Sequence, residues 1–149
     1  MIDHVWTLIC TRAIIDRDTN NLSAFNIIEQ IQIRGEPTPD GVVPIGLEVV
    51  SLWMRSDFNV PCRGRWRLSF LSPSGIQIKT VDGELDLSKY ERVRARRFFM
   101  GLPMSEPGRY RFVLELQNEG KEDWQQVASI PLKVVFQPKQ AELQQAEQE

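Results

Sequence analysis

Asp16, Asp18 and Asn20 are the first residues in this chain whose type and spacing could do chemistry. They match the opening D-x-D-x-N of a calcium loop, in which alternate side-chain oxygens bind the ion. The rest of the loop departs from that pattern, because its sixth position is Asn21 rather than glycine and its twelfth is Ile27 rather than glutamate. Asp and Asn are also the usual residues of hairpin turns. We therefore predict a polar hairpin turn here, with a calcium site as the alternative.

Arginines recur at every second position in three segments, and side chains two residues apart on a strand share one face. Arg92, Arg94 and Arg96 are our candidate residues for contact with an anion, because a guanidinium binds planar anions through two parallel hydrogen bonds. The other ladders are Arg63, Arg65 and Arg67, and Arg109 with Arg111. The structural alternative is cross-strand pairing on outer sheet faces with acidic residues, namely Glu48, Glu84, Asp86 and Glu115.

Nucleophiles and metal ligands are scarce. The chain has one histidine, His4, and two cysteines, Cys10 and Cys62, and it has no glycine-rich phosphate loop. Cys10 lies within an apolar alternation that is typical of a buried thiol, whereas Cys62 is expected in a loop as an exposed thiol. No pair of carboxylates is marked as a general acid and base. We therefore expect no catalytic residue, no metal site, no cofactor and no enzymatic activity.

Composition and charge indicate an ordinary globular domain. The 149 residues are 42% hydrophobic and 26% charged, with a formal net charge of −2. Residues 1–136 carry equal numbers of basic and acidic residues, which is unlike a nucleic-acid binder. No apolar run approaches the ~20 residues of a membrane span, and the N-terminus does not resemble a signal peptide. We expect a cytoplasmic protein that binds neither nucleic acid nor membrane.

Alternation of apolar and polar residues dominates the chain and predicts strands without helices. The expected strands are residues 4–15, 22–33, 45–55, 65–71, 76–81, 91–100, 109–117 and 124–136, with a short run over residues 84–87 after the fifth. Asp82-Gly83 predicts a turn, and Pro131 places the last strand at a sheet edge because proline cannot donate to a ladder. We predict an all-β, antiparallel β-sandwich of about eight strands over residues 1–136, then a flexible Gln/Glu-rich tail over residues 137–149. Trp6, Trp53, Trp66 and Trp124 share parity with aliphatic neighbours and are expected in the core.

Two stretches resemble known families. The run Glu106-Pro107-Gly108-Arg109-Tyr110-Arg111-Phe112 resembles the entry to the penultimate strand of immunoglobulin-like domains, with Phe112 where those domains carry a cysteine. That resemblance implies an immunoglobulin-like sandwich in which the tyrosine packs and hydrogen-bonds at a corner. The opening block, residues 10–29 with Phe-Asn-Ile-Ile-Glu at its end, resembles that of an uncharacterised family of small bacterial β-sandwich proteins. It implies the fold and carries over no activity, cofactor or site residue.

The first hairpin has aliphatic residues on both faces, although a sandwich strand needs only one buried face. Our candidate interface residues are Val5, Ile9, Ile15 and Ile28. The leading hypothesis is a module that acts through protein–protein contacts as a homo-oligomer, with strand addition at the edge of residues 124–136 as one mode. A heterologous partner and cover by this chain itself are the alternatives. A second hypothesis is a module that binds a small anion or carbohydrate through loops 35–44, 56–64 and 101–108. A third is a hydrolase of unrecognised type.

Overall fold

The computed structural model describes residues 1–137, and nine strands form within them without a helix. The strands are β1 (Ile2–Ile15), β2 (Leu22–Ile27), β3 (Gln30–Arg34), β4 (Val42–Arg55), β5 (Cys62–Leu71), β6 (Gln77–Leu87), β7 (Arg92–Pro103), β8 (Gly108–Asn118) and β9 (Gln125–Gln137). Consequently no helix in this part of the chain is long and apolar enough to cross a membrane. The tail expected over residues 137–149 lies outside the described residues apart from its first member.

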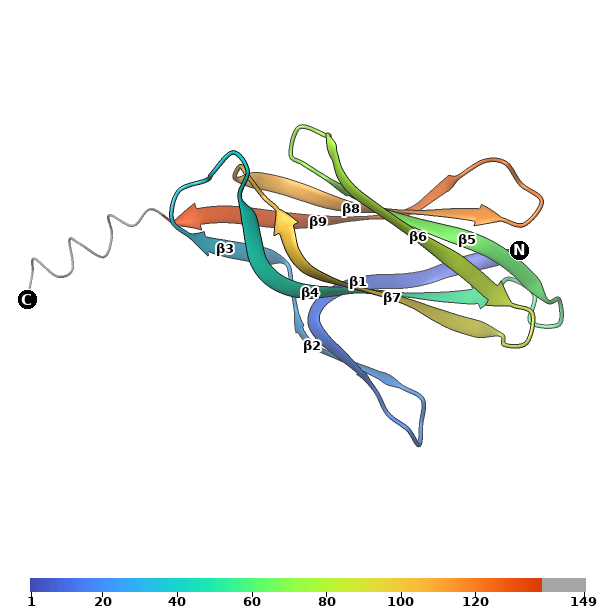
Figure 1. Ribbon diagram of the computed structural model, residues 1–149. Helices are drawn as coiled ribbons and strands as arrows, with labels where there is room; N and C mark the ends of the chain where they lie inside the picture. The colour runs from blue at the N-terminus through green and yellow to red at the C-terminus, as the bar shows by residue number, and fades with distance from the viewer. Residues whose placement is uncertain (138–149) are drawn as a thin grey trace, which may run out of the picture.

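The strands form two facing sheets, which agrees with the predicted β-sandwich (Figure 1). Sheet A has the order β2-β1-β4-β7, and sheet B has the order β3-β9-β8-β5-β6. Neighbouring strands are antiparallel except for β3 and β9, which are parallel. The alternation of apolar residues thus places one face of each sheet against the other sheet. The first strand, β1, and the last strand, β9, belong to different sheets.

Aromatic side chains fill the space between the sheets. Trp53 is fully buried and donates its indole N–H to the Ser51 hydroxyl at 2.8 Å. The Phe70 ring contacts the rings of Tyr110 and Phe112, with centroid distances of 5.3 and 4.8 Å. The Tyr110 hydroxyl donates to the Glu106 carbonyl at 2.8 Å, so the corner contact implied by the sequence is present. Trp53 and Tyr110 therefore occupy the core positions that we predicted.

The return strand of the first hairpin was predicted as one strand over residues 22–33, and this was wrong. Asn26 has a φ of +54° and its amide donates to the Thr11 hydroxyl, which breaks the alternation between β2 and β3. The chain then crosses from sheet A to sheet B. As a result Phe25 and Ile27 are exposed while Ile31 is buried, although a single strand over residues 22–33 would place all three on one face.

The turn predicted at Asp82-Gly83 was also wrong, because β6 runs through both residues. Gly83 lies against the Trp66 ring: a Cβ on this glycine would stand 2.6 Å from the indole Nε1. The glycine is therefore explained by the close approach of a buried side chain to the strand backbone rather than by a turn.

The edge position predicted for the last strand holds for only half of β9. Residues 133–137 pair with β3 on one side and the strand pairs with β8 on the other. Pro131 precedes the segment that β3 covers, so its missing N–H removes no bond to β3. The parallel pairing with β3 joins residues about 100 positions apart, which a local pattern does not reveal.

Two tryptophans depart from the predicted core. Trp6 is half-buried in a second, smaller apolar cluster that also contains Cys10, Ala13 and Val50. Trp124 precedes β9, and the guanidinium of Arg67 lies 4.2 Å from the centroid of its ring. Parity with aliphatic neighbours misplaced Trp124, because a bulge at the start of the β8–β9 pairing resets the alternation.

Candidate functional site

Arg94 and Arg96, two of the candidate anion-contact residues, connect β7 to the β1–β2 hairpin of the same sheet. Arg96 pairs with Glu48 and donates to the Ala13 carbonyl at 2.9 Å. Arg94 donates to the Asn20 carbonyl at the hairpin tip. The third residue, Arg92, is exposed. Structural contacts thus account for two of the three arginines, and contact of this ladder with an anion remains a prediction.

The ladder on β5 lies on the outer face of sheet B and meets carboxylates there. Arg67 pairs with Glu115 at 2.7 Å. The two other pairs are more exposed and longer, Arg65 with Asp82 at 3.3 Å and Arg63 with Asp86 at 3.5 Å. This face therefore follows the structural alternative of cross-strand ion pairs.

The Asp16 segment forms the tip of the β1–β2 hairpin. One carboxylate oxygen of Asp16 accepts the backbone N–H groups of Asp18 and Thr19, at 2.8 and 2.9 Å. These hydrogen bonds, with that from Thr19 the largest contribution, lower the pKa of Asp16. Among residues 1–137 no group of three His, Cys, Asp or Glu side chains is placed to hold a metal ion. The hairpin turn is thus the structure that this segment adopts.

The histidine and the cysteines lie in separate environments. Cys10 is fully buried, as the apolar alternation predicted. Burial raises the pKa of its thiol. Cys62 begins β5, half-buried, and points its thiol at the Met1 carbonyl at 3.5 Å, so the exposed loop thiol that we expected was wrong. His4 bonds to the Thr7 hydroxyl at 2.6 Å, and burial lowers its pKa.

An apolar groove of about 580 Å³, the β1–β9 groove, lies between the two sheets along one open side of the sandwich. Its aliphatic lining residues are Leu8, Ile9, Ile27, Ile28, Ile130 and Pro131. Two strand edges lie along this side that pair with no other strand of residues 1–137, residues 2–8 of β1 and residues 125–131 of β9. β2 pairs with β1 only from Cys10 onwards, and β3 pairs with β9 only from Lys133 onwards. The groove therefore combines apolar side chains with free backbone groups.

The backbone of β9 alternates between the β8 side and this open side. The Lys133 N–H points away from β8, because it donates to the Glu29 carbonyl at 3.2 Å. Ser129 and Pro131 have the same parity, so the N–H of Ser129 and the carbonyls of both residues face the open side. Ser129 is exposed. This edge is thus able to exchange hydrogen bonds with an added strand.

The four predicted interface residues are distributed over different environments. Ile9 and Ile28 line the β1–β9 groove, and the side chain of Ile9 is only 1% exposed because it also belongs to the main core. Val5 and Ile15 are exposed and lie outside the lining of the groove. Pro131 had predicted a sheet edge in the last strand, but the sequence did not show that this edge lies opposite Ile9 and Ile28, since it comes from the far end of the chain. The interface role of all four residues remains a prediction.

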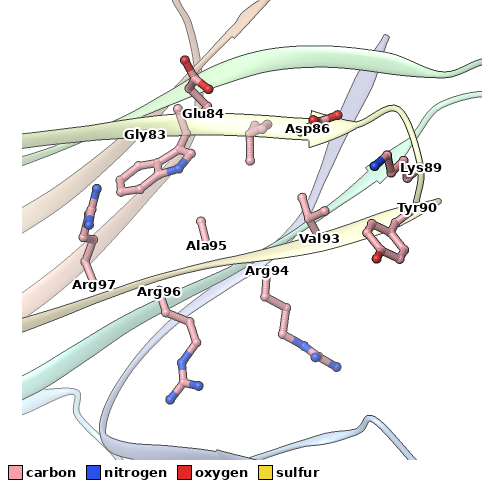
Figure 2. Close-up of a pocket in the computed structure, with 12 residues that line it drawn as sticks. Gly83, Glu84, Asp86, Lys89, Tyr90, Val93, Arg94, Ala95, Arg96 and Arg97 are labelled. Carbon is pink, nitrogen blue, oxygen red and sulfur yellow. The ribbon is translucent and has the colours of Figure 1, made fainter.

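A second hollow, the β6–β7 slot, opens on the opposite side of the sandwich (Figure 2). It has a volume of about 450 Å³ and lies between β6 and β7, the terminal strands of their sheets. Val93 and Ala95 project from β7 into the slot, whereas Arg94 and Arg96 extend from the other face of the strand. Arg97 spans the opening and donates to the Asp82 carbonyl at 2.7 Å. We predicted a turn within β6, which is one wall of the slot, and therefore did not predict this site from the sequence.

The three loops of the small-ligand hypothesis are not gathered into one site. Loops 35–44 and 101–108 meet at one end of the sandwich, where the Met104 N–H donates to the Gly41 carbonyl at 3.2 Å. The segment 56–64 lies at the other end, beside Met1 (Figure 1). Binding of a ligand by all three loops together has no geometric support here.

No family model and no curated protein matches this chain. Among solved structures it is similar to a family 123 glycoside hydrolase from Clostridium perfringens, with a TM-score of 0.50 and 12% identity. That match covers 93% of this chain and 28% of the hydrolase chain. The chain is also similar to the N-terminal domain of PorA, with a TM-score of 0.32, 13% identity and coverage of 89% and 98%. The hydrolase match shows a shared β-rich fold, and the resemblance to a bacterial family remains a prediction.

The expectation that the protein is not an enzyme is corrected by the hydrolase match. A fold like that of this chain recurs in part of an enzyme, so the fold does not separate enzymes from binding modules. The argument from composition was also too broad. Few histidines and cysteines disfavour zinc and thiol chemistry, but glycoside hydrolysis generally uses carboxylates.

Proposed function

We propose that this chain is a protein-contact module that assembles with a second copy of itself along the free edge of β9. The observation that carries the proposal is the segment 125–131, whose side away from β8 pairs with no strand among the described residues and lies beside an apolar groove. Strand addition at such an edge derives affinity from main-chain hydrogen bonds and specificity from side chains at alternate positions. Long unpaired edges are otherwise a liability that proteins protect.

A two-fold axis at Ser129 is the arrangement that fits this edge. Two antiparallel copies of β9 would exchange a pair of N–H to carbonyl bonds between Ser129 and Ser129 of the second copy. Pro131 has only a carbonyl to offer, so the pairing is short. The two five-stranded sheets would then become one continuous sheet. The apolar surface of the β1–β9 groove, including Ile28 and Ile130, would lie next to this junction and lose contact with water.

We also infer an immunoglobulin-like arrangement of the sandwich. The parallel pairing of β3 with β9 and the Tyr110 corner at the start of β8 support it. In this interpretation β3 and the added strand would lie on the same side of β9, one after the other. The chain's own β3 pairs with residues 133–137, and the strand of the second copy would pair with the segment before them.

The test is the mass in solution by size-exclusion chromatography with light scattering over a range of concentrations. We expect a dimer for the wild type and for Ser129→Ala, which keeps the backbone N–H. Ser129→Pro should be monomeric, because proline removes that N–H and its ring blocks the approaching strand. Pro131, two residues later, shows that this side of the strand tolerates proline.

Circular dichroism of Ser129→Pro should match the wild type, which separates loss of pairing from loss of folding. A wild type that stays monomeric at the highest concentration would contradict self-assembly. A folded Ser129→Pro variant that still dimerises would contradict the β9 edge as the contact.

A further inference from the structure

The β6–β7 slot has the size and lining of a site for a small molecule. Its volume of about 450 Å³ falls within the range of ~300–1,000 Å³ that is usual for such sites. Trp66, Leu85, Val93 and Ala95 supply apolar walls. The β6–β7 turn closes one end, where Figure 2 shows Lys89 and Tyr90. The apolar part of a small ligand would therefore contact side chains of both strands and the turn that joins them.

Of the two acidic residues beside the slot, Asp86 is engaged elsewhere and Glu84 is directed away from it. Asp86 accepts the backbone N–H and the hydroxyl of Ser88, at 2.9 and 2.5 Å, and pairs with Arg63 at 3.5 Å. Glu84 points away from β7 (Figure 2), and it lies opposite Arg65 in the register of β5 and β6. Neither carboxylate is therefore directed into the slot.

The basic residues at the slot differ from the acidic ones. Lys89 makes no ion pair or hydrogen bond with another described residue, and it stands at the closed end of the slot. Arg97 is held at the other end by the Asp82 carbonyl, with its guanidinium 5.1 Å from the centroid of the Trp66 ring. Glu84 makes no ion pair with a described residue either, but it is directed away from β7, so Lys89 is the unpaired charge at the end of the slot.

We propose that the β6–β7 slot binds a small organic anion with a flat or short aliphatic body. The body packs between Val93 and Ala95 of β7 and Leu85 of β6. The anionic group accepts a hydrogen bond from the Lys89 ammonium, and Arg97 adds positive potential from the opposite end. This site is separate from the β9 edge, so ligand binding here does not depend on self-assembly.

The test is a titration with 2-naphthoate, followed by amide chemical shifts in NMR spectra. We expect saturable shifts confined to residues 83–86 and 89–97. Lys89→Gln should weaken binding about fivefold, the scale of one exposed ion pair. Lys121→Gln is the matched control, because it makes the same substitution at an exposed lysine that does not line the slot; it should leave the affinity unchanged.

Two further measurements separate the class of ligand and the location of the site. The neutral analogue 2-naphthalenemethanol should bind at least fivefold more weakly than the anion, and Ala95→Phe should abolish binding by filling the slot. The proposal is overturned by any of three results: no saturation with naphthoate, equal affinity of Lys89→Gln and wild type, or shifts centred on residues 7–9 and 130–133 of the other groove. Because Lys89 is exposed, Lys89→Gln keeps the test valid even if Ala95→Phe does not fold.

Discussion

Glu48 of β4 and Arg96 of β7 form an ion pair that binds both backbone groups of Ala13. The Ala13 N–H donates to the Glu48 carboxylate at 3.0 Å, and Arg96 donates to the Ala13 carbonyl at 2.9 Å. β1 stops pairing with β4 at Cys10, so side chains here replace a neighbouring strand. The end of β1 in the β1–β2 hairpin is thereby connected to β4 and β7 of the same sheet.

Glu48→Ala should lower the free energy of unfolding by about 2–3 kcal/mol. The substitution leaves the Ala13 N–H and the Arg96 guanidinium without their acceptor, and the side chain of Glu48 is only 9% exposed. Urea unfolding followed by fluorescence measures the change. Arg63→Ala is the control, since it removes one partner of an exposed pair and should leave the midpoint almost unchanged. Equal losses in the two variants would show that the hairpin does not depend on this pair.

Stability should decrease as the pH falls below about 6.5, the ordinary pKa of histidine. Burial lowers the pKa of His4, although a hydrogen bond with the Trp6 backbone partly opposes it. The unfolded chain therefore takes up the proton before the folded protein does, and acid favours unfolding. The contribution of His4 is complete above the ordinary pKa and is lost progressively as the pH falls towards the lowered value.

Urea midpoints at pH 7.5 and pH 5.5 measure this effect, and His4→Asn should remove the difference between them. His4 is the only histidine in the chain, so no other histidine titrates in that window. An unchanged pH dependence in His4→Asn would assign it to carboxylates instead.

Gly83→Ala should destabilise the protein by about 1–3 kcal/mol, because the new methyl group meets the buried Trp66 ring. Near-ultraviolet circular dichroism should report a displaced indole. Gly46→Ala is the matched control: its methyl group meets the end of Phe98, which is exposed and free to move. A Gly83 variant as stable as the Gly46 variant would mean that Trp66 adjusts without cost.

Tyr110→Phe should cost about 1–1.5 kcal/mol, the usual contribution of one hydrogen bond. The hydroxyl donates to the Glu106 carbonyl at 2.8 Å, and the ring would keep its stacking against Phe70. Thermal unfolding is a suitable measurement. A loss of several kcal/mol would indicate that the hydroxyl also organises the β7–β8 connection, whereas no loss would show that water replaces the bond.

The sequence by itself determined the elements and most of the core. Alternation is a local property, so it identified nearly all the strands, the buried Trp53 and Trp66, and the apolar surplus that includes Ile9 and Ile28. Composition likewise indicated an ordinary globular domain. It did not exclude enzymatic activity, because carboxylates are too common in proteins for their presence to reveal a catalytic role.

The tertiary structure decided where alternation fails and which strands meet. One residue with positive φ, Asn26, separated β2 from β3, and contact with Trp66 explains a glycine that sequence rules assign to a turn. Both grooves arise between strands of different sheets, whose pairing partners lie far apart in the chain. Strand pairing depends on long-range packing, whereas a sequence pattern records only the faces of each strand separately. Pro131 indicated an edge in the last strand, but the groove beside β9 and the β6–β7 slot are properties of the folded molecule alone.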